Sequence, residues 1–136
     1  MGILRAATAF LLVAVCATAL AAKHDYKAVY SLQAEVALGQ LQAMAPQISG
    51  NATEAKADGI ATNKKLEELI GPALTAAKGH ADLVKAIKEY YVAAVAYFES
   101  LGALDLIAAA NTKRAEAAMN EKETALKLEL KLVGAE

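Results

Sequence analysis

The side chains best suited to metal chemistry in this sequence are its two histidines, His24 and His80. Cleavage of a leader after Ala21 would make His24 the third residue of the new chain. In that position the terminal amine, two backbone amides and the imidazole can bind Cu(II) or Ni(II) in a square plane. His24 is therefore a candidate metal ligand only if cleavage follows Ala21. His80 has no second ligand four residues on, and we interpret it as a surface or capping residue.

Sequence motifs of enzymes and of haem proteins are missing. The chain contains no G-x-S-x-G, no H-E-x-x-H, no E-x-x-H and no C-x-x-C-H. Its carboxylates and lysines form i,i+4 pairs, as in Lys64–Glu68, Lys85–Glu89 and Glu123–Lys127, which is typical of a solvated helix surface. We therefore predict that the protein is not an enzyme and holds no cofactor.

Residues 1–21 have the organisation of a cleavable signal peptide. Arg5 lies in a short first segment, apolar residues continue to about Ala17, and small residues at Ala19 and Ala21 form an A-x-A cleavage pattern. The apolar core is shorter than the ~20 residues of a permanent membrane span. The sequence predicts a leader over residues 1–21 and no stable transmembrane anchor.

Cys16, the only cysteine, lies inside this leader. A lipoprotein signal needs a small residue before the cysteine, and Val15 fits that pattern poorly. We therefore expect Cys16 to be removed, which leaves a cysteine-free mature chain over residues 22–136. Such a chain is stabilised by helix packing rather than by disulfides. We expect it in the periplasm or outside the cell.

The charge balance argues against polyanionic partners. The chain has 14 Lys and Arg against 15 Asp and Glu, and losing Arg5 changes the formal net charge from −1 to −2. Nucleic-acid binding is not expected of such a chain. The triplet Asn51–Thr53 fits both a glycosylation acceptor and a helix cap, and the sequence alone leaves both interpretations open.

Alanine content and only two prolines favour helix almost everywhere. Because the residue before a proline avoids the α conformation, we expect the first helix to run from about Asp25 to Ala45, before Pro46. The second expected helix runs over 52–70; Asn51 can cap its start, with Glu54 three residues on, and Gly71–Pro72 ends or kinks it near Ile70. The third runs from about 82 to 101, and the fourth over 106–133 with Asp105 as a candidate N-cap. Gly102 separates the last two in our preferred interpretation, although a single long helix stays open. The predicted fold is an all-α single domain over residues 22–136, an up-and-down antiparallel bundle of about four helices.

The third expected helix has the clearest apolar face. This face repeats every three to four residues and comprises Val84, Ile87, Tyr91, Ala94, Phe98 and Leu101. Such a face is usually core. As an alternative, Tyr91, Ala94 and Phe98 are candidates for lining a pocket between the helices for a small apolar ligand.

Within the segment 125–133, residues 126–132 alternate strictly between leucine and charged residues. Alternation predicts a strand, but its residue types are strong helix formers and the chain offers no partner strand, so we prefer a helix. A helix would place Leu126 and Leu130 on one side and Leu128 and Leu132 on the other. We regard these four leucines as candidates for a contact with a protein partner or in a homo-oligomer.

These observations together predict an exported, non-catalytic helical protein. It would act by protein–protein interaction or in a structural role of the cell envelope or exterior. A carrier of a small apolar ligand held between the helices is the alternative.

Overall fold

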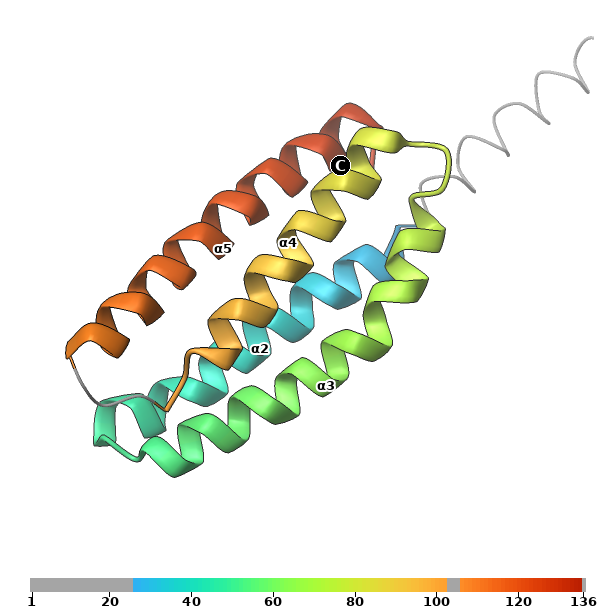
Figure 1. The fold of residues 1–136 in the computed structure, drawn as a ribbon. Helices are drawn as coiled ribbons and strands as arrows, with labels where there is room; N and C mark the ends of the chain where they lie inside the picture. The colour runs from blue at the N-terminus through green and yellow to red at the C-terminus, as the bar shows by residue number, and fades with distance from the viewer. Residues whose placement is uncertain (1–25, 103–105, 136) are drawn as a thin grey trace, which may run out of the picture.

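A computed structural model describes residues 26–102 and 106–135, and these residues form four helices (Figure 1). The helices are α2 (Lys27–Ser49), α3 (Ala52–Ala76), α4 (Ala81–Glu99) and α5 (Leu106–Leu132). Successive helices run in opposite directions (Figure 1). The predicted all-α class with four helices is confirmed. The predicted leader and His24 lie outside the described residues, as does Asp25, where we expected the first helix to begin.

Short polar and glycine residues set the turn between α2 and α3. Gly50 has a φ of 73°, and the Asn51 N–H donates to the carbonyl of Pro46 at 2.8 Å. Asn51 then caps α3: its Oδ1 accepts from the Glu54 N–H at 3.1 Å, while its Nδ2 donates to Glu54 Oε2 at 3.0 Å. This reciprocal pair satisfies a backbone donor at the helix start. The predicted cap at Asn51 is confirmed.

Both prolines lie inside helices, contrary to our prediction that Pro46 ends the first helix and that Gly71–Pro72 ends or kinks the second near Ile70. α2 continues to Ser49 and α3 to Ala76. Pro46 is buried in the last turn of α2, so its packing offsets the backbone hydrogen bond that its ring removes. At the second site, Gly71 has no Cβ to clash with the ring of Pro72, which relieves the usual restriction on the preceding residue.

The last two helices are separate, with a break at Gly102, as in our preferred interpretation. α4 ends at Glu99, and Gly102 has a φ of 89°, a left-handed conformation that favours glycine. A Cβ on Gly102 would lie 2.7 Å from the carbonyl oxygen of Ala52, so this turn also packs tightly on the start of α3. The proposed cap of α5 at Asp105 lies outside the described residues.

Two helical glycines allow α2, α3 and α4 to approach closely. A Cβ on Gly39 of α2 would lie 2.5 Å from Thr62 Cγ2 and 2.9 Å from Phe98 Cζ. A Cβ on Gly59 of α3 would collide with the carbonyl oxygen of Phe98. At Gly39 the α2 backbone therefore lies against the side chains of Thr62 and Phe98, and at Gly59 the α3 backbone lies against the α4 backbone.

Helix α4 contributes more buried residues than any other described helix, and it packs against both α3 and α5. In the expected face of α4, Ile87, Ala94, Phe98 and Leu101 are buried as predicted. Val84 and Tyr91 are only partly buried, whereas Tyr90 and Tyr97 are almost fully buried. Contact on two sides makes the buried face of α4 wider than one stripe and moves its centre toward these two tyrosines. The largest fully buried side chains are Tyr90, Phe98, Leu32, Leu66, Leu83, Ile87, Met119, Leu126, Leu130 and Val29.

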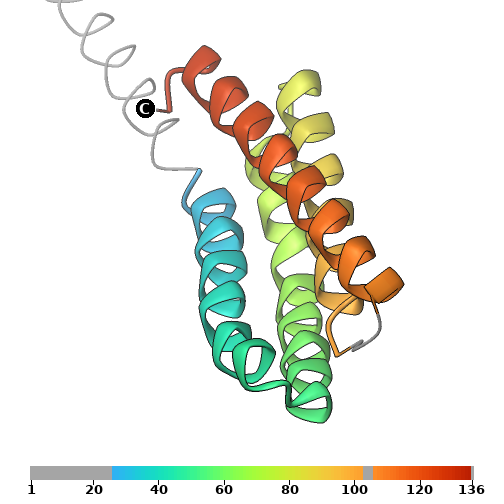
Figure 2. The same cartoon turned by 90° about the vertical axis from the view of Figure 1, so that its left-hand side faces the viewer.

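The arrangement is open between its first and last helices. The closely packed pairs are α2 with α3, α3 with α4, and α4 with α5. The beginning of α2 reaches the end of α5 through Tyr30, whose hydroxyl donates to the carbonyl of Ala135 at 3.1 Å. Toward the other end α2 and α5 diverge, as Figure 2 shows. The second half of α2 is therefore left without cover from α5.

Candidate interaction surface

Helix α2 carries two apolar stripes on opposite sides. The inner stripe packs into the core and comprises Val29, Leu32, Val36, Gly39, Ala43 and Pro46. The outer one comprises Leu38, Leu41, Met44 and Ile48, and we call it the α2 stripe. Its members follow one another at intervals of three and four residues, so they share one side of the helix. A helix in this position normally has one apolar side and one polar side, and α2 departs from that rule.

The α2 stripe is solvent-exposed. The exposed fractions are 43% for Leu38, 66% for Leu41, 52% for Met44 and 82% for Ile48. Tyr30 lies three turns before Leu41 on the same side of the helix, and its hydroxyl reaches α5. Because α5 then diverges from α2, none of the described helices packs against the part of this side that follows Tyr30 (Figure 2).

The same part of α2 carries no charge. From Val36 to Ser49 its polar side chains are three glutamines and one serine. The last charged residue before this run is Glu35, which turns toward α3 and forms an ion pair with Lys65 at 3.3 Å. The α2 stripe therefore lies in a 14-residue segment without formal charge.

The leucine-rich end of α5 is a helix, as we preferred, and not a strand. Its four leucines lie on two different sides of this helix, as predicted. Leu126 and Leu130 are fully buried core residues, so they are not available for an external contact. Leu128 and Leu132 are exposed. They lie among charged neighbours, including Lys127, which forms an ion pair with Glu123 at 3.3 Å. Only half of the predicted leucine set is thus on the surface, and it is interrupted by charge.

The residues predicted to line a ligand pocket on α4 are mostly core. Ala94 and Phe98 are buried, and the rings of Phe98 and Tyr97 meet edge to face with centroids 5.0 Å apart. Tyr91 is half-buried at the margin. Burial raises the pKa of Tyr90, and the carboxylate of Glu123 raises it further.

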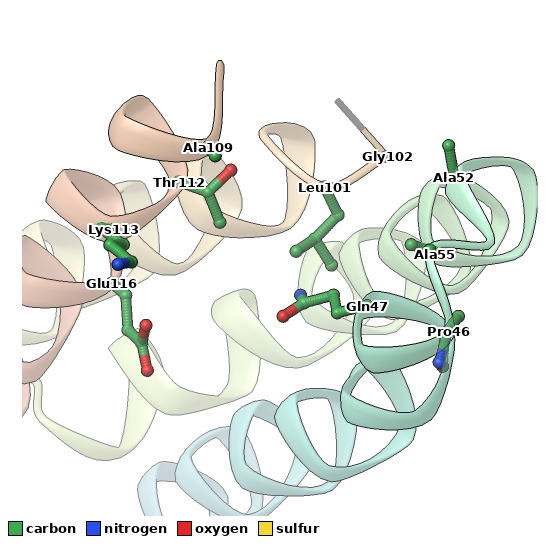
Figure 3. Close-up of a pocket in the computed structure, with 11 residues that line it drawn as sticks. Pro46, Gln47, Ala52, Ala55, Leu101, Gly102, Ala109, Thr112, Lys113 and Glu116 are labelled. Carbon is green, nitrogen blue, oxygen red and sulfur yellow. The ribbon is translucent and has the colours of Figure 1, made fainter. Parts of the chain in front are cut away.

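A hollow of about 260 Å³ lies instead near the α2–α3 turn, facing the first half of α5 (Figure 3). Leu101 and Ala55 contribute apolar walls, and Gln47, Lys113 and Glu116 contribute polar groups from α2 and α5. The pKa of Tyr97 is raised above its ordinary value, chiefly by burial. A side-chain hydrogen bond with Gln47 lowers this pKa, and the carboxylate of Glu116 raises it. The remaining lining residues are Pro46, Gly50, Ala52, Gly102, Ala109 and Thr112.

Within residues 26–102 and 106–135, no group of three or more His, Cys, Asp or Glu side chains is placed to hold a metal ion. His80 lies before α4 with its ring 6.3 Å from that of Tyr26. In the part of the chain that the structure describes, no helix has the length and apolarity needed to cross a membrane.

Comparison of the chain with protein-family models, with curated proteins and with solved structures finds no match in any of the three.

The α2 stripe was missed in the sequence. Two apolar stripes on one helix, separated by glutamines and alanines, give an almost uniformly apolar segment with no clear period. The available signal was the length of the uncharged run from Val36 to Ser49. A helix that is apolar all round must be covered on every side, and a four-helix arrangement covers only part of each helix.

Proposed function

We propose that this chain is an exported, non-catalytic protein that acts by binding another protein through the α2 stripe. The observation that carries the proposal is a contiguous apolar stripe, exposed and free of charge, on one side of an otherwise packed helix. Single exposed apolar residues are ordinary, whereas contiguous exposed patches are typical of interaction surfaces. The scaffold would be an up-and-down antiparallel bundle without disulfides.

Export is supported by the organisation of residues 1–21. We propose cleavage after Ala21 and a mature protein in the periplasm or outside the cell. Mass spectrometry of the protein recovered from producing cells tests this directly. A mass that begins at Ala22 supports export, and a retained Met1–Ala21 segment in the soluble fraction contradicts it.

Photo-crosslinking in producing cells tests the interaction role. A photoreactive amino acid replaces Leu41 in one variant and Ile60 in another. Ile60 is a good control because it is an apolar residue of α3 with an exposed fraction of 62%, against 66% for Leu41. We expect discrete protein adducts from position 41 and none, or much fainter ones, from position 60. Equal labelling at both positions, or no adduct at position 41, would contradict the role of the α2 stripe.

A second candidate function is a carrier of a small molecule with an apolar body. The hollow near Leu101 favours it, because it combines apolar walls with charged groups at Lys113 and Glu116. This location differs from the one predicted at Tyr91, Ala94 and Phe98. Native mass spectrometry should then show a bound mass that disappears in Ala109→Trp, whose indole would fill the hollow. A bare protein mass in both forms argues against a carrier.

A further inference from the structure

We infer that the occupant of the α2 stripe is a second copy of this chain, packed antiparallel across a twofold axis. This inference rests on the proposed function, since it names the partner of the same surface.

The chemistry of α2 narrows the choice of occupant. A nucleic acid or an anionic membrane surface would need cationic side chains around the contact. The segment Val36–Ser49 contains none. A second copy, by contrast, presents the same uncharged segment, so no like charges would be brought together.

The spacing of the α2 stripe also suits self-association. It extends over eleven residues from Leu38 to Ile48, or about 15 Å of helix between the first and the last. A twofold axis through its middle places Leu38 opposite Ile48 of the second copy, and Leu41 opposite Met44 of the second copy. Each side chain then meets an apolar one, as an isologous contact requires.

The available area is sufficient for a weak dimer. The exposed fractions of the four side chains correspond to roughly 450 Å² on each copy, so with neighbouring alanines the pair would bury about 1,000 Å², the lower limit of a biological interface. We therefore expect a dissociation constant in the micromolar range rather than the nanomolar range.

Sedimentation velocity over a concentration series tests the inference on purified protein. The full-length coding sequence is expressed, and the mass of the purified form is recorded first. The test variant is Leu41→Gln/Met44→Gln, which removes the central apolar contacts without adding charge. The matched control is Ile60→Gln/Val92→Gln, because these residues are 62% and 65% exposed on α3 and α4. Circular dichroism and thermal unfolding of each variant are used to check that it is folded.

We expect a monomer–dimer equilibrium for the parent and the control, with dissociation constants that agree within about twofold. In the test variant we expect dimerisation at least about tenfold weaker. A parent that stays monomeric at high micromolar concentration overturns the inference, and so does a test variant that dimerises like the parent.

Cysteine cross-linking tests the antiparallel orientation. Single variants Leu38→Cys and Ile48→Cys are prepared in a Cys16→Ser background and treated with a short bismaleimide. A mixture of the two should cross-link more efficiently than either variant alone. Preferential linking of each variant to itself would overturn the antiparallel arrangement.

Failure of this inference can be told apart from failure of the proposed function. Position-41 adducts in cells, combined with a monomeric parent in solution, would retain the interaction role and assign it to a different protein. Absence of such adducts would reject the role itself.

Discussion

Replacing Gly59 by alanine tests whether close backbone packing holds α3 against α4. The new Cβ would collide with the carbonyl oxygen of Phe98 and lie 3.2 Å from the carbonyl carbon. This carbonyl belongs to the last turn of α4 and cannot rotate away as a side chain could. Overpacking of this kind costs about 1–3 kcal/mol, and the better helix propensity of alanine returns about 1 kcal/mol. Because the clash is with backbone, we expect the upper part of that range and a net loss of about 2 kcal/mol.

Urea unfolding followed by far-ultraviolet circular dichroism measures this loss. The midpoint should fall while the slope with denaturant stays unchanged. Ala61→Gly is the matched control, because Ala61 is exposed two residues further along the same helix. It should cost about 1 kcal/mol through helix propensity alone. If Gly59→Ala instead stabilises the protein by the amount that Ala61→Gly destabilises it, the close approach of α3 and α4 is refuted.

Three further predictions concern the core, the buried tyrosines and a helix cap. Leu130→Ala should lower the free energy of unfolding by about 2–5 kcal/mol, because it leaves a cavity at a fully buried site. Leu132 is exposed, so Leu132→Ala should change this free energy by less than about 0.5 kcal/mol. Urea unfolding of the two variants measures both values. Because the pKa values of Tyr90 and Tyr97 are raised in the folded protein, the unfolded state ionises first. The contribution of these two tyrosines to stability should therefore be constant below about pH 10 and be lost above it. An ultraviolet titration in which every tyrosine ionises near the ordinary value without unfolding would contradict this expectation. Asn51→Ala should cost about 1 kcal/mol through loss of the α3 cap, and an unchanged thermal midpoint would argue against that cap.

Helix caps and helix ends that depend only on residues close together in the chain were predictable from the sequence. Asn51 and Glu54 have the spacing of a reciprocal cap, and Gly102 can adopt the left-handed conformation that ends a helix. The two helix ends predicted from prolines were wrong, because the outcome there depends on tertiary contacts. Pro46 gains burial that a local rule cannot include, and Gly71 removes the steric reason for a break before Pro72.

The candidate surface was only partly predictable for a similar reason. The helical interpretation of 125–133 separated Leu126 and Leu130 from Leu128 and Leu132, as the structure does. Periodicity cannot show that α5 diverges from α2, since that angle depends on how α3 and α4 pack between them. The exposure of Leu41 and Ile48 follows from this divergence and not from α2 itself.

The two stripes of α2 should respond differently to mutation. The inner stripe packs on Thr62 and Phe98 at Gly39, so changes there act on the free energy of unfolding. Leu41 makes no comparable core contact, so Leu41→Gln should leave that free energy within about 0.5 kcal/mol of the parent value. If it also weakens association, stability and binding are separable on one helix, which is expected when an apolar stripe is retained for a partner. If Leu41→Gln instead unfolds the protein, the stripe contributes to the core and the interaction proposal loses its basis.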